Sequence, residues 1–199
     1  MLRKSDVCCV TYFFCKKINS GSKIYFLIFF ISMIYSVLNK HDVPVSITKE
    51  THYLSDLDTD MTRYNVFDES ERHFIGYVDL RDTKNGARVL YITNQNQKLY
   101  KHFGHLADQI EVEHCMNRGI ETPYIQSVAA RDSYIQHYLR GKRFINEGVN
   151  IYLGSLTENL KKGERVTADF LEYQKMYMPI NMVNEIKDKI KRNPLLKHL

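Results

Sequence analysis

The sequence predicts an α+β fold in which helices flank a largely antiparallel sheet. Short segments rich in β-branched and aromatic residues alternate with longer segments whose apolar residues recur every three or four positions. These segments lack the regular strand–helix–strand rhythm of a parallel sheet. The chain has 199 residues, of which 44% are hydrophobic and 26% charged, so it can form one domain with a core of its own.

Three strands are predicted in the first half of the domain, after a polar, extended and partly exposed segment over residues 41–60. Each strand contains β-branched or aromatic residues, and the third follows the turn signal Asn85-Gly86. The predicted strands are Met61–Phe67, Phe74–Val78 and Arg88–Thr93.

Two helices are predicted to follow. In Asn96–Asn117 the apolar residues recur at helical spacing, and Gly119 ends the segment. Pro123 then leads into a second predicted helix over Ile125–Arg140, which ends at Gly141. The apolar positions of the first helix are Leu99, Phe103, Leu106 and Ile110.

The last fifty residues are predicted to form short elements and a final helix. Asn150–Leu153 is predicted as a strand, and Ser155-Leu156-Thr157-Glu158 as a capping box that starts a small helix ending at Gly163. Arg165–Tyr173 is predicted as a strand that carries Asp169. We expect Asn181 to cap a last helix with one apolar face, formed by Met182, Ile186 and Ile190.

Residues 1–40 differ from residues 41–199 and are interpreted as a leader before a single domain. The leader contains an uncharged run, Ile24–Leu38, which as a helix would rise about 22 Å, short of a hydrocarbon core of roughly 30 Å. Three interpretations stay open: a weak membrane anchor, a secretion leader, or sequence upstream of the true start, with Met33 as that start. Membrane association is therefore left undecided.

The charge distribution argues against nucleic acid as a partner. The formal net charge is +5, but residues 1–40 hold six basic residues and one acidic residue. Residues 41–199 therefore hold 22 basic and 22 acidic residues and are neutral overall. A neutral domain has little excess positive charge with which to displace the counterions of a phosphate backbone.

No metal site is predicted. His102 and His105 lie three residues apart, as zinc ligands on a helix can, but His114 would point to the opposite side of the same helix. Cys115 is interpreted as a small apolar residue near a helix end. The four cysteines form no paired metal motif and no disulfide framework.

Phosphate-binding loops and the motifs of hydrolases and metalloproteases are absent from the sequence. Two short motifs remain. Asp58-Thr59-Asp60-Met61-Thr62-Arg63 ends in an arginine, and Gly163-Glu164-Arg165-Val166-Thr167-Ala168-Asp169 ends in an aspartate. Taken alone, each of these charged residues is typical of an ordinary surface position.

Together, the two motifs resemble those of the EspJ/HopF family of type III secreted bacterial effectors. The first looks like the family's acidic stretch ending in its essential arginine, and the second like its glycine-containing turn and strand ending in its essential aspartate. The likeness covers about residues 45–175, includes Gly119–Gly141, and is nearer to the EspJ branch.

The resemblance implies an ADP-ribosyltransferase-like fold, NAD as cosubstrate, and secretion into the host cell cytosol. The implied activity is NAD-dependent ADP-ribosylation of a protein or an amidating variant of that chemistry. It implies a host target, a tyrosine kinase of the Src class, with inhibition of host signalling and phagocytosis. A bacterial secretion chaperone is a further expected partner. The alternative is a non-enzymatic effector that binds and masks a host protein.

The resemblance also implies roles for single residues. Arg63 would hold the diphosphate of NAD with its fork of donors. Asp169 would face the ribose, accept a hydrogen bond from a hydroxyl group and stabilise developing positive charge. Tyr64 and Ser127 are further candidates for lining the nicotinamide pocket.

Overall fold

The computed structural model describes residues 31–35, 44–55, 59–68, 73–95, 100, 102–128, 133–162 and 174–196. These residues form eight strands in one sheet, in the order β1-β2-β3-β4-β5-β6-β8-β7, together with five helices. Every neighbouring pair of strands is antiparallel except β5 and β6. The predicted mixture of helices with a mostly antiparallel sheet is therefore confirmed.

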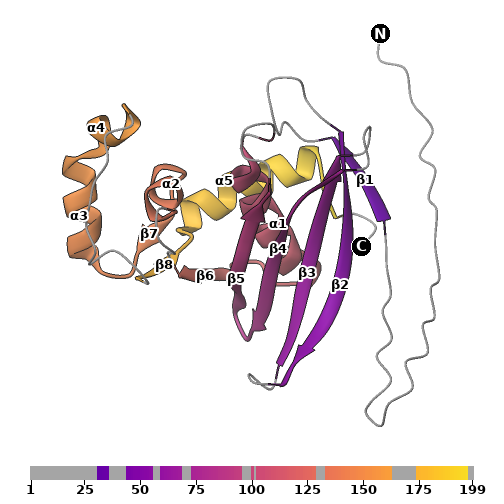
Figure 1. The fold of residues 1–199 in the computed structure, drawn as a ribbon. Coiled ribbons are helices and arrows are strands. Elements are labelled where there is room, and N and C mark those ends of the chain that lie inside the picture. The colour runs from indigo at the N-terminus through magenta and orange to yellow at the C-terminus, as the bar shows by residue number, and fades with distance from the viewer. Residues whose placement is uncertain are drawn as a thin grey trace.

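Strands β2 to β5 form a meander of long, adjacent strands (Figure 1). The three predicted strands correspond to β3, β4 and β5 and are confirmed, and each is longer than expected because its ends continue to pair with the neighbouring strand. Strand β2 lies in the segment that was expected to be extended and partly exposed, and it is a paired strand with Val45 and Ile47 buried. The bounds are β2 Pro44–Leu54, β3 Thr59–Asp68, β4 Phe74–Thr83 and β5 Gly86–Asn94.

A two-residue turn joins β4 to β5 at the place that the Asn85-Gly86 signal indicates, shifted by one residue. Thr83 pairs with Gly86, which leaves Lys84 and Asn85 as the turn. A Cβ atom on Gly86 would lie 2.2 Å from the carbonyl oxygen of Tyr124, the first residue of β6 Tyr124–Val128. Glycine is therefore required here because the neighbouring strand approaches closely.

One face of the meander packs against two helices, α1 Phe103–Asn117 and α5 Ile180–Arg192. Figure 1 shows both helices on the same side of the sheet. We call this side of the sheet the core face and the opposite side the outer face. The core face of β3 to β5 contributes Tyr64, Val66, Val78, Leu80 and Val89.

Helix α1 is confirmed, although it begins at Phe103 rather than at Asn96. Its buried residues Phe103, Leu106 and Ile110 have the predicted spacing. The segment ends at Gly119, whose φ of 77° lies in the left-handed region that favours glycine. The predicted start falls partly on residues 96–99 and 101, which lie outside the described ranges.

The helix predicted over Ile125–Arg140 is wrong in its first part. Residues Tyr124–Val128 form β6, and a short helix, α2 Tyr134–Leu139, follows. Strand β6 buries Ile125 and Ser127 at alternate positions and pairs with β5 on one side and with β8 Lys175–Tyr177 on the other. Pairing with distant strands decided this segment, and it overrode the local helical spacing.

The strand predicted over Asn150–Leu153 is also wrong, because these residues lie within α3 Glu147–Ser155. The side chain of Asn146 caps this helix by accepting a hydrogen bond from Gly148 N at 3.1 Å. Val149 and Leu153, four residues apart, are buried on one helix face. Capping and helical spacing together outweigh the strand preference of four residues.

The predicted capping box does not form. Ser155 Oγ donates to the carbonyl of Tyr152 at 2.7 Å instead, so it serves the end of α3. The next helix, α4 Thr157–Lys161, has Leu156 at its N-cap and no side-chain cap. The expected end at Gly163 and the predicted strand Arg165–Tyr173 lie outside the described residues.

The last helix, α5, is confirmed, with Met182, Ile186 and Ile190 buried. Its N-cap is Pro179 rather than Asn181, which is the second residue of the helix. A second hydrophobic cluster lies beside the main core. It joins α2, α3 and α4 to β8 and to the edge strand β7 Arg143–Phe144.

Part of the uncharged N-terminal run forms the other edge of the sheet. Residues Ile31–Tyr35 are strand β1, which pairs with the first residues of β2. The other residues of the predicted leader lie outside the described ranges. Among the described helices, none has the length and apolar character needed to cross a bilayer.

Candidate functional site

Arg63 lies in the middle of β3, between two flanking strands. Its register partners are Glu50 on β2 and Asp79 on β4. Directly paired residues share a face, and successive residues of a strand alternate between faces. Arg63, Glu50 and Asp79 therefore lie on the outer face, whereas Tyr64 points to the core face.

The Arg63 guanidinium is held by a buried carboxylate. Arg63 Nε donates to Asp79 Oδ1 and Nη2 donates to Asp79 Oδ2, both at 2.7 Å. The Asp79 side chain is 0% exposed, whereas that of Arg63 is 32% exposed. The hydrogen bond to Asp79 raises the pKa of Arg63, against the opposing effect of partial burial. This two-point contact fixes the plane of the guanidinium.

An aromatic ring supports the same guanidinium from one side. The Cζ atom of Arg63 lies 4.2 Å from the centroid of the Tyr77 ring, a cation–π contact. Within the described part of the chain, no acceptor is bonded to Arg63 Nη1. The Arg63 guanidinium can therefore donate from Nη1 to an anion, and Asp79 and Tyr77 already fix the direction in which these donors point.

Further polar residues of β2 and β3 lie beside this pair. Glu50 Oε1 accepts from Asn65 Nδ2 at 2.8 Å, and His52 Nε2 lies 3.1 Å from Glu50 Oε2. Glu50 is the register partner of Arg63, so a second carboxylate lies close to the guanidinium. This carboxylate would limit the negative charge that the site tolerates and would favour a ligand that also has donor groups.

Tyr64 is separated from Arg63 by the sheet. It is 2% exposed, and its hydroxyl donates to His114 Nδ1 at 2.8 Å. His114 Nε2 lies 2.6 Å from Asp82 Oδ1, so the ring proton is assigned to Nε2. Burial lowers the pKa of His114, consistent with a neutral ring. Tyr64 thus has a structural partner and little surface to offer a cofactor.

Ser127 is buried in β6, with 4% of its surface exposed. In the register it pairs with Met176 of β8, and it lies on the same face as Ile125. Its Oγ is the one buried side-chain polar atom of the described residues that has no hydrogen-bond partner. Buried hydroxyl groups are normally satisfied, so an unpaired one calls for an explanation, and a bound ligand is one.

The described structure does not bring the four predicted site residues together. Arg63 is on the outer face, whereas Tyr64 and Ser127 lie on the side of the core. Asp169 lies outside the described residues. Of these residues, Arg63 has the geometry of an anion-binding group.

Of the histidines and the cysteine that suggest a metal, His114 has hydrogen-bond partners of its own and Cys115 is buried. The rings of His102 and His105 lie 5.9 Å apart between centroids, and His114 is bonded to Tyr64 and Asp82. Burial raises the pKa of the Cys115 thiol to about 12, far from that of a reactive thiolate. Among the residues that the structure describes, no three potential ligands gather around a common point.

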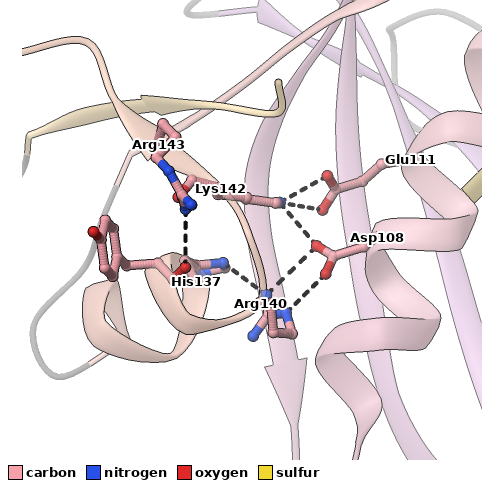
Figure 2. A network of polar contacts seen from close by, with 7 residues as sticks. Asp108, Glu111, His137, Arg140, Lys142 and Arg143 are labelled. Atoms are coloured by element: carbon pink, nitrogen blue, oxygen red, sulfur yellow. Dashed lines mark hydrogen bonds and ion pairs between the residues drawn. The ribbon is translucent and has the colours of Figure 1, made fainter. Parts of the chain in front are cut away.

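Sequence reasoning missed a buried network of charged residues, shown in Figure 2. Lys142 Nζ donates to both carboxylate oxygens of Glu111, at 2.8 and 3.0 Å, and lies 3.1 Å from Asp108 Oδ1. Arg140 Nε donates to Asp108 Oδ2 at 2.7 Å, and Arg140 Nη2 lies 2.8 Å from His137 Nδ1. The network connects α1 to α2 and to the start of β7.

The physical state of this network favours a structural role. Burial alone would lower the pKa of Lys142, but the charges of Glu111 and Asp108 raise it, so the amine stays protonated. Burial is likewise outweighed at Asp108, whose pKa is lowered by the charges of Lys142 and Arg140. Asp108 and Glu111 lie three residues apart on α1 and are visible in the sequence. Their partners Arg140 and Lys142 lie about thirty residues further along the chain, so the sequence does not show that these charges meet.

Comparison with known proteins gives this chain no family. Its sequence matches no model of a known protein family, and no curated protein matches it significantly.

Proposed function

We propose that this protein is an NAD-dependent ADP-ribosyltransferase with an ADP-ribosyltransferase-like fold, of the type found in the EspJ/HopF effectors. One observation carries the proposal: the Arg63 guanidinium, held by Asp79 at two points and stacked on Tyr77, leaves its Nη1 edge to a ligand. Arginine at this place is also what the two motifs imply by resemblance.

The fit to NAD can be judged from the donor set. A diphosphate offers several oxygens, and the donors at Arg63 Nη1, which Asp79 leaves unused, can bond to one of them. The Arg63 side chain is partly exposed and its plane is fixed, so it would lose little conformational freedom on binding. The nearby carboxylate of Glu50 suits a ligand that presents hydroxyl groups as well as phosphates.

The chemistry of the reaction assigns a task to each of the two motif residues. Bound NAD would supply the ADP-ribosyl group, whose bond to nicotinamide breaks as a nucleophile of the target protein attacks. Arg63 would fix the diphosphate and so orient the scissile bond. Asp169 would accept a hydrogen bond from the ribose and stabilise the positive charge that develops there.

Ser127 takes no part in the proposed site, because it lies on the same face of β6 as buried Ile125, on the core side of the sheet and opposite to Arg63. Tyr64 takes no part, since its hydroxyl is bonded to His114 on the core face. The target would be a host tyrosine kinase of the Src class, reached after secretion into the host cytosol with a bacterial chaperone as escort. These last points are proposed from the resemblance of the two motifs.

The experiment is a transfer assay with a tagged NAD analogue, read out by mass spectrometry of the candidate kinase. Arg63→Lys keeps a charge beside buried Asp79 while removing the fork, so it tests the site with less risk to folding than truncation. We expect Arg63→Lys and Asp169→Asn each to lower labelling about a hundredfold or more.

Matched controls come from α5, whose polar side is exposed. Arg192→Lys and Asp188→Asn make the same chemical changes there and should keep full labelling. Labelling unchanged by Arg63→Lys and Asp169→Asn would exclude the proposed site. If the kinase is bound but never labelled, the protein is instead a non-enzymatic effector that masks its partner.

A further inference from the structure

A row of residues on the outer face crosses the sheet from β4 to β7. Arg81 of β4 pairs in register with Arg88 of β5, and Arg88 pairs with Gln126 of β6. Gln126 pairs with Tyr177 of β8, which in turn pairs with Arg143 of β7. We call these five residues the arginine row.

The row lies on the same face as Arg63. Met61, two residues before Arg63, is the register partner of Arg81. The exposure of the side chains agrees with this placement. Arg88 is exposed on the outer face, whereas its neighbours Ala87 and Val89 are buried on the core face. Neighbouring strands are about 4.8 Å apart, so the four steps from Arg81 to Arg143 span roughly 19 Å.

The two arginines at the β4–β5 end of the row have no charged partner within the described part of the chain. Neither Arg81 nor Arg88 forms an ion pair or a side-chain hydrogen bond there. Arg143 donates only to backbone carbonyls, those of Tyr138 and Lys142, and lies over the Tyr138 ring. Like charges directly opposite each other on neighbouring strands destabilise a sheet, so the Arg81–Arg88 pair has a cost in the free protein.

Aromatic residues accompany these charges. Tyr177 stacks on Tyr124 with 6.2 Å between ring centroids, and Tyr124 is 44% exposed. At the β7 end, which is the edge of the sheet, Arg143 and Tyr177 line a pocket of about 260 Å³ that also reaches the start of α5, so one carboxylate, Glu185, lies in the same pocket as Arg143. Arginine and tyrosine are enriched in the parts of protein interfaces that contribute most to affinity.

We propose that the arginine row docks an extended, acidic segment of a partner protein. Six residues of extended chain span about 20 Å, close to the length of the row. A single phosphate or diphosphate would cover only the Arg81–Arg88 end. Nucleic acid fits less well, because residues 41–199 are neutral overall and the row offers three arginines over a length in which duplex DNA carries many more phosphates.

The test uses the full chain and a fluorescent hexaglutamate peptide, with a hexaglutamine peptide of equal length for comparison. Anisotropy should show binding of hexaglutamate alone, weakening as salt is added. Arg81→Gln and Arg88→Gln should each weaken binding several-fold, and the double variant about tenfold or more.

Arg192→Gln is the matched control, because it removes one arginine charge from the end of α5, on the other side of the sheet. It should leave the affinity unchanged within about twofold. Equal affinity of the double variant and the unaltered protein would overturn the proposal. So would a hexathymidine oligonucleotide that binds through the same arginines more tightly than the peptide, since the row would then recognise phosphate.

A second readout requires no ligand. Because Arg81 and Arg88 repel each other in the free protein, Arg88→Gln should raise the melting temperature at low salt, and added salt should remove the difference. An Arg88→Gln protein that is unfolded or less stable would contradict the claim that Arg81 and Arg88 repel each other. Neither experiment involves NAD or transfer, so failure here is distinct from failure of the proposed transferase activity.

Discussion

Lys142 and Glu111 form a two-point contact in the interior of the protein. Lys142 Nζ lies 2.8 and 3.0 Å from the two carboxylate oxygens of Glu111, and the two side chains are 1% and 0% exposed. The contact joins the middle of α1 to the residue that precedes β7 (Figure 2). It therefore connects the main core to the second cluster, formed around α2, α3 and α4.

The first prediction concerns this contact. Lys142→Met should lower the free energy of unfolding by about 3–5 kcal/mol, because it leaves a buried carboxylate without its cation. Urea titration followed by circular dichroism measures the change. Lys161→Met is the control, since Lys161 is 60% exposed and its ion pair with Glu158 lies at the surface; its effect should stay within about 0.5 kcal/mol. A similar cost for both variants would contradict the network's structural role.

The second prediction concerns Arg63 and Asp79. Arg63→Ala should cost about 3–5 kcal/mol, since the Asp79 carboxylate is fully buried and would lose both donors. Arg63→Ala and Asp79→Ala should not add: a double-mutant cycle should give a coupling energy of about 1–3 kcal/mol. The exposed pair Lys191 and Asp188 provides the comparison, with a coupling below about 0.5 kcal/mol. Additive effects at Arg63 and Asp79 would show that the two side chains do not interact.

The third prediction concerns pH. Burial, followed by the charges of Lys142 and Arg140, lowers the pKa of His137 from 6.5 to about 3. The unfolded chain therefore binds a proton at His137 between these values while the folded chain does not, so stability falls as pH falls through this window. From pH 7 to pH 5 this group should remove about 2 kcal/mol of the unfolding free energy.

His137→Gln isolates this effect, because glutamine keeps an acceptor for Arg140 but does not titrate. Other groups titrate over the same range, so the quantity to compare is the difference between the variant and the unaltered protein at each pH. As the pH is lowered, the unfolding free energy of His137→Gln should rise relative to that of the unaltered protein. A difference that stays constant from pH 7 to pH 5 would rule out a neutral, buried His137.

The fourth prediction compares two helical glycines. A Cβ on Gly104 would lie 2.5 Å from Arg140 Nη1, whereas a Cβ on Gly154 would meet only Tyr138 Oη, at 3.5 Å. Gly154→Ala should stabilise the protein by about 0.5–1 kcal/mol, since alanine is the better helix former. Gly104→Ala should lose that gain and destabilise, because Arg140 must move away from Asp108. Thermal unfolding of both variants decides this, and stabilisation by Gly104→Ala would contradict the close packing.

Local patterns were sufficient where a segment makes its contacts with near neighbours in the chain. The strands β3, β4 and β5 follow one another through short connections, and their β-branched and aromatic residues predicted them. Helix α5 was also predicted from its own sequence, in which the apolar stripe and the polar side are both visible. The prediction for β6 was wrong because pairing with distant strands decided it. The prediction for α3 was wrong for a local reason, since its cap Asn146 and its helical spacing are both visible in the sequence.

In the candidate site, too, some features can be inferred from the sequence and others depend on how distant segments pack. The resemblance of its motif singles out Arg63, and the alternation of a strand already implies that Arg63 and Tyr64 face opposite sides. The partner that fixes Arg63 could not be inferred, because Asp79 lies sixteen residues away and an aspartate in a strand is ordinarily exposed. The unpaired hydroxyl of Ser127 is likewise a property of its surroundings.

By itself, the sequence determined the mixture of strands and helices, three of the four strands of the central meander and the apolar face of α5, because periodicity and turn residues act over a few positions. The tertiary structure alone decided which charges meet: Arg63 with Asp79, Lys142 with Glu111, and Arg81 beside Arg88. The physical reason is that burial and distance set the strength of an electrostatic contact, and both are known only once distant segments have packed.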